Sequence, residues 1–231
     1  RNGKDLVALI KKETGIETRI ISGIQEAEYI YYGVKKAMDL GSKPTLIMDI
    51  GGGSIEFIIG TNDKIIWRQS FEIGGQRMVE KFQKNDPILE EDKVALIEYL
   101  NLNLKELFEA HAEHQPKTLI GSSGTFDTLS DIYALKESVD RPKEATEYPL
   151  TLSSFQIIHE ELLTKDRDQR LQIPGMIPLR VDMIVVASIL VNYLINKLQL
   201  TDIRVSGYAL KEGVLLNTLN ALKEEETLKS S

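Results

Sequence analysis

The sequence predicts an α/β domain that begins with three antiparallel strands and continues with two parallel strands reached through helical crossovers. Short apolar runs joined by glycine-containing links occupy residues 44–71, and strand-like and helical segments alternate after residue 117. Hydrophobic period and turn residues give the order β-β-β-α-β-α-β-α from residue 44. This order is typical of a ribonuclease H-like domain, in which each crossover is right-handed.

The first three strands are predicted from apolar runs of six to eight residues. They cover Thr45 to Ile50, Ser54 to Ile59 and Lys64 to Phe71. Gly51-Gly52-Gly53 and Gly60-Thr61-Asn62-Asp63 join them, and both links suit hairpins.

The rest of this domain is predicted to alternate helices with two further strands. Apolar residues recur at a helical period between 181 and 198. Strands are expected at 118–121 and 203–206, and a loop at 138–150. A short helix is expected to begin at residue 74, and further helices are expected over 88–111, 126–135, 153–163, 176–198 and 208–222.

Residues 1–43 do not fit this pattern and are predicted to be the end of a preceding domain. A helix from Asn2 to Thr14, a strand over 17–21 and a helix over 24–38 are expected there. Residues 44–222 would form the second domain, and residues 223–231 a frayed tail.

Composition narrows the possible partners and locations. The chain has 231 residues, a net charge of −7 and no cysteine. The negative charge disfavours nucleic acid and anionic membranes as partners, and the longest apolar run is too short and polar to span a bilayer. Absence of cysteine excludes thiolate metal sites and suits the cytoplasm.

Glycine-rich turns follow three of the predicted strands, and ligands of α/β sheets gather at such ends. A turn of Gly51, Gly52, Gly53 and Ser54 offers amide donors without obstruction by Cβ atoms. Gly121, Ser122, Ser123, Gly124 and Thr125 could do the same and add hydroxyls at a helix start. With Gly207, these turns indicate a phosphate site, although each alone could be an ordinary turn.

Two carboxylates lie next to the triple-glycine turn. Asp49 ends the first strand, and Glu56 shares a face of the second strand with Ser54. A turn cap and a solvated strand residue would explain them singly. Together beside an anion site they favour a cation between them, and Mg²⁺ is the natural one because it takes oxygen ligands.

Other polar residues have ordinary explanations. Glu26 follows Ser22-Gly23, and helix capping explains this stretch best from the residues alone. Arg180 and Asp182 form an ion pair or face the cleft, and we favour the ion pair. The histidines lack ligand spacing and are expected at the surface: His111, His114 and His159.

Five segments together resemble the exopolyphosphatase/guanosine pentaphosphate phosphohydrolase family of the actin–sugar kinase–Hsp70 superfamily. They are ISGIQEAEYIYYGV, MDIGGGSIEF, GSSGTFDTL, PGMIPLRVDM and IRVSGYALKEGVL. This family has two ribonuclease H-like domains with the active site between them. The resemblance implies hydrolysis of terminal phosphoanhydride bonds of inorganic polyphosphate, or of guanosine pentaphosphate, in a homodimer.

The resemblance also assigns roles to the candidate residues. It makes Glu26 the general base for the attacking water, and Asp49 and Glu56 the carboxylates associated with Mg²⁺. The phosphate loops would be Gly51–Ser54 and Gly121–Thr125. Phosphoryl transfer needs little beyond this alignment and charge neutralisation.

The chain departs from the family pattern in several places. The first phosphate loop and a Thr-Ser-Ala-x-Arg stretch are absent, and Lys211 replaces an arginine. The 231 residues alone are therefore expected to be inactive. A non-hydrolytic binding module and a sugar- or acetate-kinase-like transferase are the competing functions. The sequence does not choose between polyphosphate and guanosine pentaphosphate as the substrate.

Overall fold

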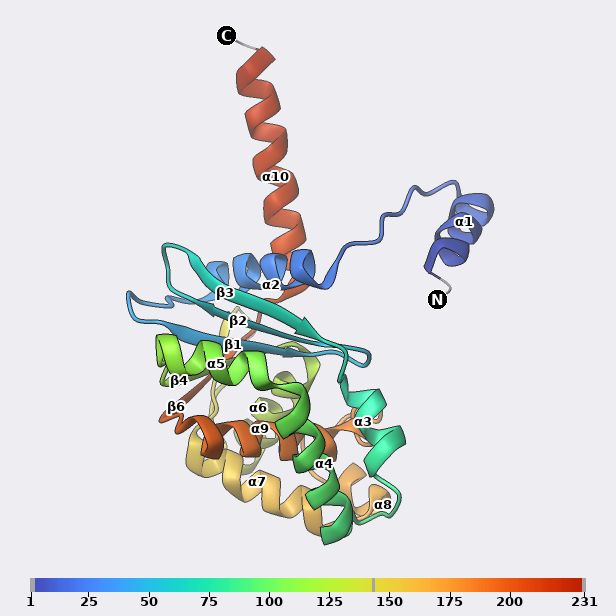
Figure 1. Cartoon of the computed structure of the whole chain (residues 1–231), viewed down its shortest axis with the longest axis vertical. Coiled ribbons are helices and arrows are strands. Elements are labelled where there is room, and N and C mark those ends of the chain that lie inside the picture. Colours follow the sequence, from blue (N-terminus) through green and yellow to red (C-terminus); the bar gives the residue numbers. More distant parts are fainter. Residues whose placement is uncertain (1–2, 143, 230–231) are drawn as a thin grey trace.

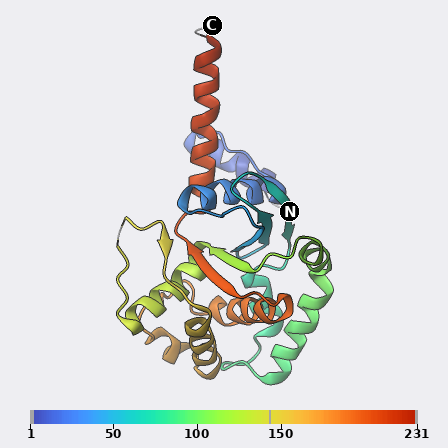
Figure 2. The same ribbon diagram turned by 90° about the vertical axis from the view of Figure 1, so that its left-hand side faces the viewer.

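A computed structural model describes residues 3–142 and 144–229 and contains a six-stranded mixed sheet. Neighbouring strands follow the order β3-β2-β1-β4-β6-β5 (Figures 1 and 2). Their bounds are β1 Thr45–Ile50, β2 Ile55–Gly60, β3 Ile65–Phe71, β4 Thr118–Ser122, β5 Glu147–Tyr148 and β6 Asp202–Ser206.

The pairing confirms the predicted topology. Strands β1, β2 and β3 are antiparallel, whereas β4 pairs in parallel with both β1 and β6. The short β5, inside a segment predicted to be a loop, adds an antiparallel edge to β6. Parallel pairing brings the carboxyl ends of β1, β4 and β6 to one edge of the sheet.

Helices cover both faces of the sheet (Figure 1). The helices are α1 Gly3–Thr14, α2 Gly23–Ala37, α3 Gly75–Phe82, α4 Glu90–Asn103, α5 Lys105–His114, α6 Ser123–Glu137, α7 Leu152–Thr164, α8 Arg167–Leu171, α9 Met183–Leu198 and α10 Leu210–Lys229. One face packs against α2 and the start of α10, and the other against α3 to α7 and α9.

Alternating residues of β1 divide the core into two clusters. Leu46 and Met48 point into the larger cluster with α4, α6, α7 and α9. Ile47 points to the opposite face, where it meets Ile30 and Val34 of α2. Because successive strand residues alternate between faces, Asp49 lies on the α2 face.

Helix α2 begins and ends as its sequence predicts. The Ser22 hydroxyl accepts from the Gln25 amide, and the Gln25 side chain accepts from the Ser22 amide. Gly15 likewise follows α1 with a positive φ of 72°. Asn2, predicted as the cap of that helix, lies outside the described residues.

Four expectations about secondary structure are wrong. Residues 17–21 form no strand, because residues 17–20 are exposed and none of the described strands pairs with them. The helix expected over 88–111 is two helices that meet at Leu104, where ψ is 21°. Residues 176–182 form no helix, since Gly175 has φ 91° and Pro178 follows; residues 178–182 are turns and α9 begins at Met183. Residues 223–229, expected to fray, continue α10.

One histidine also differs from expectation. His159 is buried at 3% exposure, stacks on Phe155 with ring centroids 5.9 Å apart, and bonds Ser188 Oγ through Nδ1 at 3.0 Å. Burial lowers the pKa of its imidazole. Its place four residues after Phe155, on the apolar face of α7, explains the burial.

No helix in the described part of the chain is long and apolar enough to cross a membrane.

Candidate functional site

Asp49 and Glu56 lie directly opposite each other in the antiparallel ladder of β1 and β2. Residues opposed in this way project to the same face of a sheet. The two carboxylates therefore share the face covered by α2, beside the turn that joins their strands.

Asp49 is a buried carboxylate held by two hydroxyl groups. It is 6% exposed, and Oδ2 accepts from Ser122 Oγ at 3.1 Å and Ser123 Oγ at 2.5 Å. Burial raises its pKa to about 6, the two hydroxyl bonds oppose this, and the charges of Glu26 and Asp127 add to it. Burial thus makes its ionised form less favourable than that of an exposed aspartate.

Glu56 is buried even more completely, at 1% exposure. Ser70 Oγ donates to its Oε1 at 2.6 Å. Burial raises the pKa of Glu56 to about 7, while the bonds from Ser70 and Ser54 lower it and the charges of Glu26 and Asp49 raise it. Two adjacent acids with raised pKa values mark a functional-site candidate.

Glu26 approaches the same carboxylates from α2. It lies in the first turn of that helix and is half-buried, and burial raises its pKa. Its charge raises the pKa of both Asp49 and Glu56. The structure therefore brings together the three acidic residues that the sequence analysis singled out.

The chemistry of these side chains fits a hard divalent cation. The available donors are carboxylate and hydroxyl oxygens, which Mg²⁺ prefers. Within the described residues, no three His, Cys, Asp or Glu side chains converge as a complete metal site. Mg²⁺ is commonly held by only one or two carboxylates, with substrate phosphates and water as its other ligands. Asp49 and Glu56 would supply these two carboxylates.

The triple-glycine turn has a bound side and an open side. Its carbonyls accept from the start of α3: Gly74 N to Gly53 O, Gly75 N to Gly51 O and Gln76 N to Gly52 O. A Cβ on Gly53 would meet nothing within 4 Å, and one on Gly52 only Gln76 Cβ at 3.8 Å. The surrounding fold thus leaves room for side chains at 52 and 53, so close approach of an anion remains a reason for bare backbone.

The second loop, residues 121–125, joins β4 to α6. Ser123 adopts a left-handed φ of 68°, a strained conformation that is often found at ligand sites. No side chain caps the start of α6. Gly121 has a packing role, because a Cβ there would lie 2.0 Å from the Phe126 ring.

Arg180, for which the sequence analysis favoured a structural ion pair with Asp182, lies beside the second glycine-rich loop. Asp182 pairs with Arg167 at 2.9 Å instead. The Arg180 guanidinium lies over Gly124, where a Cβ would be 2.3 Å from Nη2. It lines a cavity of about 660 Å³ with Ser123, Asp127 and Lys211, which we call the Arg180 pocket.

Two buried atoms in the Arg180 pocket, Arg180 Nε and Asp127 Oδ1, have no hydrogen-bond partner among the described residues. Burial raises the pKa of Asp127. The charges of Arg141, Arg180 and Lys211 oppose this rise, so Arg180 interacts with a nearby carboxylate. The Nη2 of Arg180 is the atom that lies over Gly124. The spacing of residues along the sequence could not have revealed this position of Arg180, since it depends on how residues 172–182 fold back onto α6.

Gly207, the third predicted turn, serves the fold. Its amide donates to Thr146 O at 2.8 Å, and a Cβ would meet the Tyr148 ring at 2.6 Å. It lines the Arg180 pocket without a free amide.

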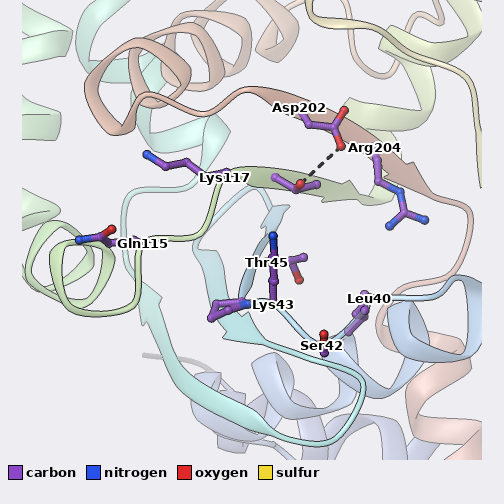
Figure 3. Close-up of a pocket in the computed structure, with 11 residues that line it drawn as sticks. Leu40, Ser42, Lys43, Thr45, Gln115, Lys117, Asp202 and Arg204 are labelled. Atoms are coloured by element: carbon purple, nitrogen blue, oxygen red, sulfur yellow. Dashed lines mark hydrogen bonds between the residues drawn. The ribbon is translucent and has the colours of Figure 1, made fainter.

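A separate pocket of about 460 Å³ lies at the other end of β1, near Lys43, Lys117 and Arg204 (Figure 3). Arg204 is already paired with Glu147 at 2.7 Å. The Lys117 side chain points away from Arg204 in this view. The positive groups do not converge, so this pocket is not a second phosphate cradle.

The sheet order and the loops at the carboxyl ends of β1 and β4 define a domain with the actin-like ATPase fold. The chain belongs to the Ppx/GppA phosphatase family, whose model matches residues 1–222.

Solved structures of relatives agree with this assignment. An exopolyphosphatase from Cytophaga hutchinsonii is 43% identical, with a TM-score of 0.91 over 95% of this chain and 71% of that chain. A Ppx/GppA family member from Aquifex aeolicus is 26% identical, with a TM-score of 0.77 over 97% and 71%.

Curated sequences extend the comparison to longer proteins. Exopolyphosphatase 1 of Mycobacterium leprae is 21% identical over 221 residues, which are 95% of this chain and 65% of that protein. The chain thus spans about 65% of the length of this relative.

Proposed function

We propose that the protein hydrolyses the terminal phosphoanhydride bond of inorganic polyphosphate and releases phosphate. The observation that carries the proposal is the grouping of Glu26, Asp49 and Glu56 beside the open side of the triple-glycine turn. The exopolyphosphatase relative at 43% identity supports the choice of substrate.

Glu26 is the general base in this proposal. The oxygen of a water molecule attacks the terminal phosphorus, a proton of that water passes to the Glu26 carboxylate, and the bond to the bridging oxygen breaks. Burial raises the pKa of Glu26, which makes its carboxylate a better proton acceptor. The shortened polyphosphate leaves with the bridging oxygen.

The loops hold the phosphoryl oxygens. The amides of Gly52, Gly53 and Ser54 would bind the substrate from one loop, and Gly121–Thr125 and the Arg180 guanidinium from the other. The open space at Gly53 and the position of Arg180 over Gly124 support this arrangement. Asp49 and Glu56 would hold Mg²⁺, and a bound cation supplies neutralisation of phosphate charge. Ser122, Ser123 and Ser70 keep these two carboxylates oriented.

The organisation of the whole protein is part of the proposal. In this proposal residues 1–43 belong to a first ribonuclease H-like domain and residues 44–222 form the second, on whose sheet α2 packs. The substrate would lie where the two meet, beside Glu26. A cytoplasmic homodimer is expected.

Guanosine pentaphosphate is the alternative substrate, because the name of the family covers both activities. A binding module without turnover is the second alternative. Phosphate release by the full-length protein from each substrate, with and without Mg²⁺, separates them. Release from polyphosphate that requires Mg²⁺ supports the proposal, whereas tight binding of polyphosphate without any release favours the binding module.

A further inference from the structure

Arg170 is the largest fully buried side chain described, with no exposure to solvent. Its guanidinium pairs with Asp86 through two bonds, Nη1 to Oδ1 at 2.7 Å and Nη2 to Oδ2 at 3.1 Å. It also donates to two backbone carbonyls, Lys165 O at 2.5 Å and Val181 O at 3.2 Å.

This ion pair ties together segments that are distant in sequence. Asp86 comes from the link between α3 and α4, and its Oδ2 also accepts from the Arg167 amide at 2.7 Å. Arg170 comes from α8, which lies beside that link in Figure 1. Val181 precedes α9. The pair therefore fixes the point at which the chain enters α9.

The Val181 carbonyl belongs to the residue that follows Arg180. Val181 is fully buried, whereas the preceding Leu179 is 78% exposed and Ile177 is 42% exposed. The Arg170 bond thus holds the backbone at the boundary between an exposed segment and the core. One residue earlier, the Arg180 side chain turns onto Gly124.

Stability alone is a weak explanation for this pair. Desolvation of two charges offsets most of their attraction, and apolar residues of similar volume often stabilise a core as well or better. Methionine or leucine, however, could not donate to the Val181 carbonyl. The feature that only the charged pair provides is a fixed backbone position.

We propose that Asp86 and Arg170 are positioning residues for phosphate binding, because their buried ion pair holds residue 181 and so places the Arg180 guanidinium over Gly124. This inference rests on the proposed function, in which Arg180 contacts the substrate phosphates.

A double-mutant cycle in the full-length protein tests the proposal, with tripolyphosphate as the probe and Mg²⁺ present. The apolar replacement Asp86→Leu/Arg170→Met is combined with Arg180→Ala, and dissociation constants are measured by calorimetry. We expect the replacement and Arg180→Ala each to weaken binding about tenfold, and the triple variant to bind no more weakly than Arg180→Ala. Effects that multiply in the triple variant would overturn the proposal.

Arg170→Lys is a second test that does not depend on whether the apolar variant folds. Lysine can retain a charge contact with Asp86 but cannot donate at the same time to Val181 O in the geometry of Nε. We expect weaker tripolyphosphate binding with a melting temperature close to the wild type. Unchanged affinity would show that the bond to Val181 is dispensable.

A readout independent of phosphate is trypsin cleavage after Arg180. With the Val181 carbonyl released, cleavage there should accelerate roughly tenfold in the folded protein. The ion pair of Arg204 with Glu147 offers a remote control, and Arg204→Met/Glu147→Leu should change neither cleavage at Arg180 nor affinity. Unchanged cleavage in the Asp86/Arg170 variants refutes the positioning role, whereas wild-type protein that binds no tripolyphosphate refutes the proposed function.

Discussion

Asp49 and Glu56 face each other across β1 and β2, and both are nearly excluded from solvent. Two neighbouring acids in such a place repel each other unless a proton or a cation intervenes. The closeness of the two carboxylates therefore affects the affinity of the site for Mg²⁺ and the pH dependence of stability, and the latter can be measured without knowing the substrate.

Glu26→Gln tests the general base. We expect phosphate release from polyphosphate to fall about 10²- to 10⁴-fold, while the dissociation constant for tripolyphosphate changes little. The measurement is phosphate release by the full-length protein under saturating substrate, alongside calorimetry.

Glu28→Gln is the matched control for Glu26→Gln, since Glu28 lies on the same helix but pairs with Arg68 at 3.4 Å. Equal losses in the two variants would argue against a special role for Glu26.

Asp49→Asn tests the cation site. Asparagine retains an oxygen that can accept from Ser123, so the loop should keep its shape. We expect Mg²⁺ to bind about tenfold more weakly, so that a titration of tripolyphosphate binding with Mg²⁺ reaches its midpoint at a Mg²⁺ concentration about tenfold higher. A Mg²⁺ titration identical to that of the wild type would exclude Asp49 as a ligand.

Glu56→Gln tests the pH dependence of stability in the presence of a chelator. The pKa of Glu56 rises from an ordinary 4.5 to about 7 on folding. The folded state therefore binds more protons than the unfolded state in this window, and the free energy of unfolding falls as pH rises from 4.5 through 7. Glutamine removes this dependence.

We expect Glu56→Gln to raise the free energy of unfolding at pH 8 by at most about 3 kcal/mol, and to have little effect at pH 4.5. Thermal unfolding at both pH values provides the measurement. Glu98→Gln, at an exposed position, should show no such difference, and a gain that is larger at the lower pH would contradict the assignment.

Gly53→Ala and Gly124→Ala test the two loops. The fold leaves space at Gly53, and the clash at Gly124 is with the flexible end of Arg180. Both variants should therefore melt within a few degrees of the wild type, yet bind tripolyphosphate about tenfold more weakly. Wild-type affinity in Gly53→Ala would show that phosphate does not approach that turn.

Gly213→Ala tests the contact between α2 and α10. The added Cβ would lie 1.7 Å from the Tyr29 carbonyl oxygen, a backbone clash that no rotamer relieves. We expect a loss of about 2–4 kcal/mol in denaturant unfolding. Gly41→Ala is unsuitable as a control because its φ is 75°, so Gly53→Ala serves instead.

The sheet and the two strand carboxylates, Asp49 and Glu56, were predictable because local rules decide them. A strand period of two and a hairpin at Gly51–Gly53 are enough to put Asp49 and Glu56 on one face. The position of Glu26 above them required the resemblance, since helix capping was the better explanation of that stretch from the residues alone.

The remaining features depend on contacts between distant segments. Arg180 lies over Gly124 in a segment that follows a close approach to α6 at Gly175, where an added Cβ would be 2.6 Å from the Ile132 amide nitrogen. The break at Leu104 is equally hidden, because apolar residues keep the helical period across it and remain buried on both sides. Neither contact leaves a signal in nearby sequence.

The crossing of α2 and α10 has a mechanical consequence. Side chains usually keep packed helix axes 8–10 Å apart, but here Gly33 and Gly213 let the two main chains touch. No side chains separate the two backbones at this crossing. A shift of α10 would therefore move α2, the helix that carries Glu26. The position of the proposed general base, Glu26, therefore depends on the position of α10, which is the last helix of the chain.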